Sequence, residues 1–289
     1  MNYPAVAEVP VWLRIIRFPL VRILVLGGGL LYLMSYTEEV MIPYKDTPLT
    51  AVGIALAFCL LGMAIYVAYG RFVEGREVTE LSTPGMAREW VIGALLGAGL
   101  YTACVLVLMA MGIFTIQGLN PWAFLIPAIG MALKSGVFEE LVFRGVLFKS
   151  TEDMLGSWAA IIISSAVFGF LHLVNPDATI GGAIFITIEA GLLLAAAYLA
   201  TRRLWLCIGF HMSWNYVQSA VFSGIVSGGV AEPGLLQKTI VGSDLMTGGS
   251  FGMERSILAL LFDTTAGLVL LWIAYRRGHI RPFSLSKNS

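Results

Sequence analysis

The sequence contains little charge for its length. Asp, Glu, Lys and Arg make up 12% of the 289 residues, whereas hydrophobic residues make up 58%. Ordinary globular domains carry about 25% charged residues. Because this shortage extends over the whole chain, it predicts an integral membrane protein rather than a soluble protein with a single anchor.

Two further classes of protein find no support in the composition. The 18 basic and 18 acidic residues give a net charge of zero, so the chain lacks the positive excess typical of nucleic-acid-binding proteins. Cysteine is scarce as well, and Cys59, Cys104 and Cys207 fall in apolar runs without CxxC spacing. We interpret them as small packing residues, not as a disulfide framework or a metal site.

Apolar runs of the length that crosses a bilayer, about 20 residues, recur along the whole sequence. They predict an all-α, polytopic membrane protein in which residues 1–289 form one integral membrane domain. Eight spans are predicted, at about 18–36, 50–69, 90–113, 121–148, 156–174, 180–200, 204–224 and 256–275. The first run follows Arg14 and Arg17 but no small-residue cleavage site follows it, so we interpret it as a retained helix.

The basic residues are distributed unequally between the two sides of this layout. Fourteen of the 18 Lys and Arg fall on the side of the N-terminus, three fall on the opposite side, and Lys134 lies within a helix. This bias predicts that both termini are cytoplasmic. On the opposite side, residues 224–252 contain eight glycines and are predicted to form either an ordered irregular loop or a flexible one.

Three charges interrupt the apolar run 121–148, in the stretch FEELVFRGVLF. A charge at the centre of a spanning helix costs about 2.5–3.5 kcal/mol on insertion scales. Glu140 and Arg144 are four residues apart and can form an ion pair on one helix face, whereas Glu139 is rotated by about 100° and lacks that partner. An alternative is that these side chains snorkel to the interface, which explains Arg144 better than the paired glutamates.

Two more pairs, each containing a histidine, have the same spacing of four residues, which places both members on one helix face. They are Phe168 with His172 and His211 with Asn215. Taken singly, His172 could be an interfacial residue, and the second pair could hold two helices together. The occurrence of all three pairs on consecutive predicted helices favours a shared site.

Lys134, Glu189 and Asp263 are further ionisable residues within apolar runs. Each acid could be a transport residue, an interfacial residue or a partner of Lys134 in a buried ion pair. The sequence assigns no role to any of the three.

The ordered set Glu139-Glu140-x-x-x-Arg144, Phe168-x-x-x-His172 and His211-x-x-x-Asn215 resembles the pattern EExxxR, FxxxH and HxxxN of the CAAX protease and bacteriocin-processing (CPBP) family. This family includes the type II CAAX prenyl endopeptidases. The resemblance covers the predicted core helices, about 121–224, and implies an intramembrane endopeptidase. Its substrate would be a membrane-associated peptide or protein, lipidated or plain. The stretch MTGGSFGMERS, residues 246–256, is similar to a segment of prokaryotic members, which implies a prokaryotic cytoplasmic membrane.

Amide hydrolysis needs an activated water and donors for the oxyanion. We expect Glu139 and His172 to activate the water, and His211 and Asn215 to stabilise the oxyanion. Glu140, Arg144 and Phe168 would support them. The resemblance favours this glutamate mechanism without a cofactor. A zinc site formed by Glu139, His172 and His211 is the alternative, since catalytic zinc uses such His₂Glu sets, although HExxH is absent.

Two other functions remain open at this stage, namely a non-catalytic immunity or scaffold protein that retains the motif, and a small ion transporter. One geometric difficulty also remains. With spans 121–148 and 156–174, Glu139 lies near the cytoplasmic end of its helix while His172 lies near the far end of the next. Straight helices at about 1.5 Å per residue would keep the two apart, unless Pro127 bends the fourth helix or the fifth helix tilts or starts later.

Overall fold

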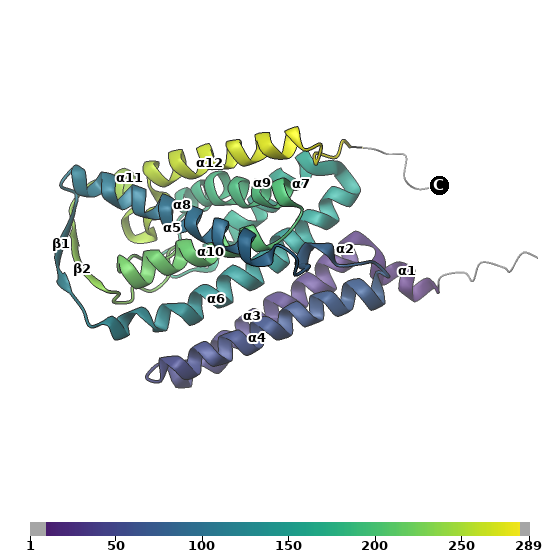
Figure 1. Cartoon of the computed structure of the whole chain (residues 1–289), viewed down its shortest axis with the longest axis horizontal. Helices are drawn as coiled ribbons and strands as arrows, with labels where there is room; N and C mark the ends of the chain where they lie inside the picture. Colours follow the sequence, from purple (N-terminus) through teal and green to yellow (C-terminus); the bar gives the residue numbers. More distant parts are fainter. Residues whose placement is uncertain (1–9, 284–289) are drawn as a thin grey trace, which may run out of the picture.

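The computed structural model describes residues 10–283. Its helices lie side by side along the long axis of the molecule and form a bundle (Figure 1). In chain order they are α1 (Val11–Arg17), α2 (Pro19–Arg22), α3 (Gly28–Met41), α4 (Pro48–Ala68), α5 (Met86–Ala110), α6 (Pro127–Glu140), α7 (Lys149–Leu171), α8 (Ile180–Ile186), α9 (Leu192–Thr201), α10 (Trp205–Tyr216), α11 (Asp244–Thr247) and α12 (Ile257–Arg276). π-helical segments extend or join several of them, at Ile23–Gly27, Tyr69–Val73, Leu141–Phe148, Thr187–Gly191 and Val217–Val221.

Six of the helical stretches within residues 10–283 are long and apolar enough to cross a membrane. The predicted all-α, polytopic membrane fold is confirmed, whereas the predicted number of eight spans is not. One candidate span, Trp122–Val174, contains 53 residues and is broken at Gly156. The six are Pro19–Tyr44, Pro48–Val73, Met86–Ala110, Trp122–Val174, Ile180–Thr201 and Ile257–Arg276.

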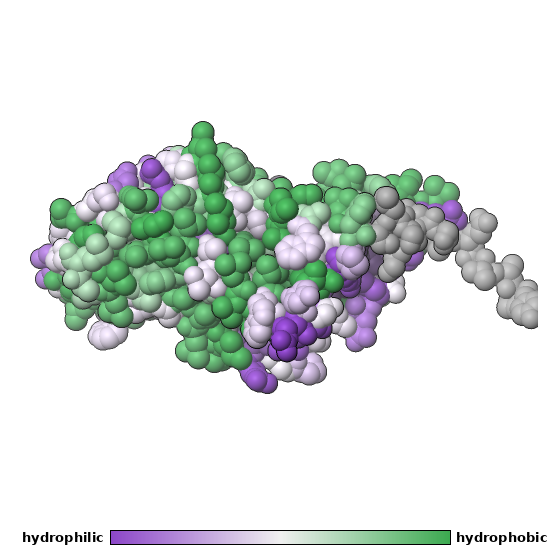
Figure 2. All heavy atoms as spheres, turned by 90° about the horizontal axis from the view of Figure 1, so that it is seen from above, coloured by the Kyte–Doolittle hydropathy of each residue, from purple (hydrophilic) through white to green (hydrophobic). Residues whose placement is uncertain are grey.

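The surface of the bundle is largely apolar. Figure 2 shows hydrophobic residues over the middle of one face, with hydrophilic residues gathered mainly toward one end. Leu24, Leu60, Leu95 and Leu268 are each more than half exposed, although they lie on four different helices. In water such a surface would be unfavourable, but lipid tails solvate it, so the bundle is an integral membrane protein.

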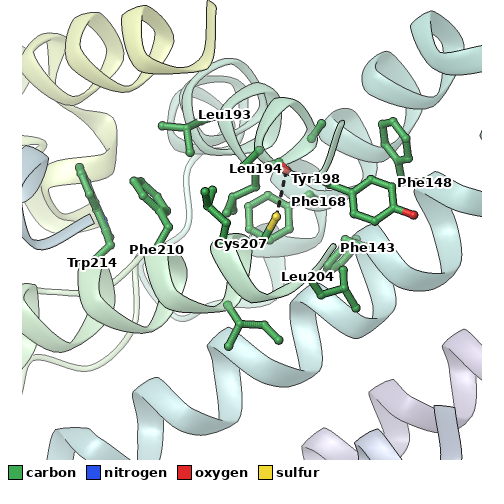
Figure 3. Packing of buried hydrophobic residues seen from close by; sticks show 14 of the residues in the cluster. Phe143, Phe148, Phe168, Leu193, Leu194, Tyr198, Leu204, Cys207, Phe210 and Trp214 are labelled. Atoms are coloured by element: carbon green, nitrogen blue, oxygen red, sulfur yellow. Dashed lines mark hydrogen bonds between the residues drawn. The ribbon is translucent and has the colours of Figure 1, made fainter. Parts of the chain in front are cut away.

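The interior is closed by aromatic and aliphatic side chains around α7, α9 and α10 (Figure 3). Phe168 and Leu194 are almost fully buried, and the Sγ of the buried Cys207 lies 3.4 Å from the carbonyl oxygen of Leu194. All three cysteines are buried and free, which confirms their interpretation as packing residues.

Glycine allows α10 to lie directly against α5. A Cβ at Gly93 would lie 2.2 Å from the carbonyl oxygen of Leu206, and a Cβ at Gly209 would lie 2.2 Å from that of Trp90. Real Cβ atoms do not approach so closely, so only glycine permits this packing, as at small-residue interfaces of membrane helices. The helix that carries His211 and Asn215 is therefore fixed in position by backbone contact.

Gly156 resolves the difficulty over the depths of Glu139 and His172. Its φ of 80° and ψ of 172° break α7, so the helix that contains Glu139 continues through Leu147 to residue 155, and the predicted end at 148 is wrong. Glu139 then lies about 24 Å before this break, and His172 lies about 22 Å beyond Ser157, at about 1.5 Å per residue. The chain reverses at Gly156, and the two residues return to similar depths.

The glycine-rich loop is ordered and contains secondary structure that was not predicted. Its strand β2 (Leu236–Ile240) pairs antiparallel with β1 (Phe114–Leu119), with Phe114 opposite Ile240. This small sheet lies at the end of the bundle opposite the C-terminus (Figure 1). The prediction of a wholly irregular loop at 224–252 is therefore wrong, because pairing with a distant segment cannot be read from local composition.

Candidate active site

Glu140 lies at the centre of a buried charge network. Its side chain is fully buried, and Oε1 accepts hydrogen bonds from Arg144 Nη1 at 3.0 Å and from His211 Nδ1 at 2.8 Å. The ion pair between Glu140 and Arg144 expected from their spacing is confirmed. It lies where α6 passes into the π-helical segment Leu141–Phe148, a type of local widening that is frequent at functional sites.

Arg144 is held by more than this ion pair. Its guanidinium carbon lies 4.6 Å from the ring centroid of Phe168, within the range of a cation–π interaction. Nη2 also lies 3.5 Å from the carbonyl oxygens of Ala190 and Gly191. Arg144 is fully buried, so it does not snorkel to the interface, and the snorkelling alternative is wrong for this residue.

Glu139 differs from Glu140 in its surroundings. The Glu139 side chain is 12% exposed, and its Oε2 lies 3.8 Å from Nε2 of His211. This oxygen is buried and accepts no hydrogen bond from the part of the chain that the structure describes. Glu139 therefore has a free carboxylate beside His211, while Glu140 is occupied by Arg144 and by the other nitrogen of the same ring.

His172 and His211 both contact the ring of Phe168. The Phe168 ring packs edge-to-face against both imidazoles, with centroids 4.9 Å from His172 and 6.0 Å from His211. Nδ1 of His172 lies 2.8 Å from the carbonyl oxygen of Phe168, so this nitrogen is the donor. The proton on Nδ1 leaves a lone pair on Nε2 of neutral His172.

Asn215 is oriented by a residue that sequence reasoning missed. Its Nδ2 donates to Oγ of Ser135 at 2.9 Å, and both side chains are buried. Ser135 is one helical turn before Glu139, so it lies on the same face of α6. That spacing was the available signal, but a serine in an apolar helix is too common to single out.

A small cavity, of about 30 Å³, connects His172, His211 and Asn215. Three acids that were not assigned to the site share its wall, namely Glu189, Glu254 and Asp263. Glu139 does not line the cavity. It lies next to the cavity, where its Oε2 contacts Nε2 of His211. The structure thus brings the four predicted catalytic residues close together, with three of them lining the cavity and Glu139 beside His211.

The acids of the cavity have different partners. Glu254 accepts hydrogen bonds from Gln218 Nε2 at 2.8 Å and from the backbone and hydroxyl of Ser227 at 3.1 Å. Both carboxylate oxygens of Glu189, and Oδ1 of Asp263, are buried without a hydrogen-bond partner among the described residues, 10–283. Lys134 pairs with Glu38, so the suggestion that it pairs with Glu189 or Asp263 is wrong.

The zinc alternative would use Glu139, His172 and His211 as ligands. Within residues 10–283, no group of three or more His, Cys, Asp or Glu side chains is arranged to hold a metal ion. Nδ1 of His211 faces Glu140 and Nδ1 of His172 faces a carbonyl oxygen. Both contacts leave Nε2 of each ring available for a further partner.

The comparisons with known families agree with the motifs. Residues 120–217 match the family model described as type II CAAX prenyl endopeptidase Rce1-like. The matched segment contains every predicted site residue, and the resemblance to CPBP proteases is confirmed. The match supports a membrane protease. Comparisons with curated proteins and with solved structures gave no match.

Proposed function

We propose that the protein is an intramembrane endopeptidase that hydrolyses a peptide bond of a membrane-associated substrate. The observation that carries this proposal is the free carboxylate of Glu139, whose Oε2 lies 3.8 Å from Nε2 of a histidine that shares a buried cavity with His172 and Asn215. The family match supports the reaction class. The buried ion pair explains how the charges are tolerated inside an apolar bundle.

In the proposed reaction, Glu139 removes a proton from a water molecule while Nε2 of His172 accepts the hydrogen bond from the other O–H. The water oxygen attacks the carbonyl carbon of the scissile peptide bond. Glu139 then gives the proton to the leaving nitrogen as the C–N bond breaks, so water supplies both the hydroxyl of the new acid and the proton of the new amine. General acid–base catalysis of this kind contributes about 10²–10⁴-fold.

His211 and Asn215 are the proposed donors to the oxyanion. One N–H of the Asn215 amide is held by Ser135, and the second remains for the substrate. Because Nδ1 of His211 donates to Glu140, only the imidazolium form can also donate from Nε2. Glu139 and Glu140 are the counter-charges that such a cation needs.

The substrate class is proposed from the family name. A CAAX-type substrate would carry its scissile bond next to a prenylated cysteine, and the lipid would lie in the bilayer beside the bundle. A plain membrane peptide is the other candidate, and the experiment below compares the two.

The test is cleavage of quenched fluorescent peptides, prenylated and plain, by the purified full-length protein in detergent. We expect cleavage by the wild type, loss of at least about 10²-fold in Glu139→Gln, and an unchanged rate in Glu39→Gln, a matched control at an exposed glutamate. Cleavage by Glu139→Gln at the wild-type rate would overturn the proposal. Inhibition by a chelator with recovery on adding zinc would replace the glutamate mechanism by a metal-dependent one.

A further inference from the structure

A second cavity lies outside the candidate active site. It has a volume of about 320 Å³ and lies where α7 begins and α9 and α12 end. Its wall includes Glu80, Lys149, Glu152, Tyr198, Arg202 and Arg281. At about 30 Å³ per water molecule, it has room for roughly ten waters or a group of similar size.

The acceptors of this cavity are already occupied. Oε1 of Glu80 accepts hydrogen bonds from Tyr66 at 2.5 Å and Lys149 at 3.0 Å, and Arg76 contacts both carboxylate oxygens. Burial disfavours ionisation of Glu80, but Lys149 and Arg76 outweigh it and hold its pKa at about 2. Glu80 is therefore an ionised carboxylate without spare capacity to accept a ligand's proton.

Both carboxylate oxygens of Glu152 also accept hydrogen bonds. Oε1 accepts one from the hydroxyl of Ser157, and Oε2 accepts one from Arg202 at 2.5 Å. Both acidic side chains of the wall thus serve to fix neighbouring donors. A cationic ligand would have to compete with these contacts.

The donors of the cavity, in contrast, are only partly used. The Lys149 ammonium makes one hydrogen bond, to Glu80, out of three available. Arg281 is 59% exposed and reaches Asp153 and Glu152 only at 3.5 and 3.6 Å. The Tyr198 hydroxyl makes no hydrogen bond within the described residues, and Figure 3 shows it pointing away from the cluster around Phe168 and Cys207.

The position of the cavity relative to the bilayer can be read from α12. Trp272 and Tyr275, near the end of this helix, are 60% and 68% exposed. Exposed Trp and Tyr side chains mark the level of the lipid headgroups. The cavity is next to this level, because Gly278 and His279, just beyond α12, belong to its wall.

We propose that this cavity binds a phosphate group, with Lys149, Tyr198 and Arg281 as its donors. Phosphate is the ligand chemistry that matches free donors and occupied acceptors, and basic pockets between membrane helices near the headgroup level are suited to anionic lipids. The phosphate can belong to an anionic phospholipid or to a soluble phosphate, and both sources present the same oxygens. The site is independent of the proposed peptidase.

The proposal is tested on the purified full-length protein in a neutral detergent. The thermal unfolding midpoint is measured against increasing phosphatidylglycerol, against phosphatidylcholine with the same acyl chains, and against inorganic phosphate. A ligand that binds only the folded state raises the midpoint in a saturable way. We expect phosphatidylglycerol to do so and phosphatidylcholine not to, because the phosphate of phosphatidylcholine is neutralised by its own choline cation, and we expect added salt to weaken the effect.

Two variants locate the binding. Tyr198→Phe removes a hydroxyl that makes no hydrogen bond among residues 10–283 but keeps the ring, which packs against Phe148 with centroids 5.3 Å apart. Arg281→Gln removes a mostly exposed charge. Each should weaken phosphatidylglycerol binding roughly tenfold, since hydrogen bonds to charged groups are individually strong. Arg71→Gln, at an exposed arginine outside the cavity, is the matched control and should bind as the wild type does.

No rise of the midpoint with either phosphatidylglycerol or inorganic phosphate would overturn the proposal. A rise of the midpoint with inorganic phosphate alone, lost in Tyr198→Phe, would support the site and assign it to a soluble phosphate. Equal effects of the two lipids, or wild-type phosphatidylglycerol binding in both Tyr198→Phe and Arg281→Gln, would overturn the proposal.

Discussion

His211 donates from Nδ1 to Oε1 of Glu140 across 2.8 Å, and this hydrogen bond joins two residues that are 71 positions apart. The same oxygen accepts from Arg144 at 3.0 Å. Glu140 therefore fixes the ring of His211, and the other ring nitrogen is left facing Glu139. Orientation of a working histidine by a buried carboxylate is a common device in enzyme sites.

The first prediction concerns this buried ion pair. Arg144→Met removes the arginine and leaves a carboxylate without its ionic partner, so we expect a loss of about 3–5 kcal/mol in the free energy of unfolding. The double variant Glu140→Gln with Arg144→Met should be less destabilised than Arg144→Met alone, because no buried charge remains unpaired. Unfolding of the full-length protein in detergent measures both, with Arg71→Met as an exposed control. Equal destabilisation of the single and double variants would contradict the argument.

The second prediction concerns the oxyanion donors and depends on the proposed function. Asn215→Ala should lower kcat by about 10²–10³-fold with little change in KM, because the lost hydrogen bond forms mainly in the transition state. Ser135→Ala should lower kcat less, since the amide stays present but loses its anchor at 2.9 Å. Steady-state kinetics on one cleaved peptide separates the two constants. A rise in KM alone would assign Asn215 to substrate binding.

The third prediction concerns the break between the two motif helices. Gly156 has φ 80° and ψ 172°, a backbone region that only glycine adopts readily. A Cβ there would also lie 2.9 Å from the backbone nitrogen of Phe283. Gly156→Ala should therefore destabilise the protein by about 1–3 kcal/mol and lower peptidase activity by shifting Glu139 relative to His172.

The matched control for this change is Gly99→Ala. Gly99 lies inside α5, and a Cβ there would meet no atom within 4 Å. Alanine is the better helix former by about 1 kcal/mol, so this variant should be as stable as the wild type or more so. If both alanine variants behave alike in thermal unfolding, Gly156 does not set the depth of the site.

The extent of prediction from sequence differs between parts of this molecule. The ion pair of Glu140 and Arg144 was predictable, because spacing within one helix fixes which side chains meet. The end of this helix at residue 155 was not predictable. In the sequence, Lys149, Glu152 and Asp153 suggest that the helix has already left the membrane and ended. In the structure they are still helical and form ion pairs with Glu80, Arg202 and Arg22. Hydropathy alone does not distinguish a charged helix end from a loop.

Contacts between distant segments were equally inaccessible. Glu189 and Asp263 appeared as isolated acids, and only the packing of α12 against the segment after α8 brings them to one cavity. The pairing of Lys134 with Glu38 joins residues 96 positions apart. The site motifs were found because they are short and local, while their extension by Ser135, Glu189 and Glu254 depends on the tertiary fold.

The fourth prediction is a pH dependence that arises outside the membrane-spanning helices. Burial raises the pKa of Glu254 from 4.5 to about 7, although its hydrogen bonds from Gln218 and Ser227 oppose the shift. Between these two values the folded protein keeps a proton that the unfolded chain releases. The free energy of unfolding contributed by this group therefore falls as pH rises from about 4.5 to 7, by up to about 3 kcal/mol.

Glu254→Gln is the variant that isolates this contribution. Its unfolding midpoint, measured at several pH values from 4.5 to 8, should vary less with pH than that of the wild type over the same range. Glu80 has the opposite pH dependence. Its pKa of about 2 means that its contribution to the free energy of unfolding is lost when the pH falls into the acidic range. Parallel pH profiles for the wild type and Glu254→Gln would contradict the assignment.

The fifth prediction concerns Glu189, whose two carboxylate oxygens are buried without a partner. An unsatisfied buried polar group costs about 1–3 kcal/mol, so Glu189→Leu should raise the free energy of unfolding by a comparable amount. Glu38→Leu is the contrasting variant, since it removes the partner of Lys134 and should destabilise the protein. Thermal unfolding compares the two. Destabilisation by Glu189→Leu would contradict the argument.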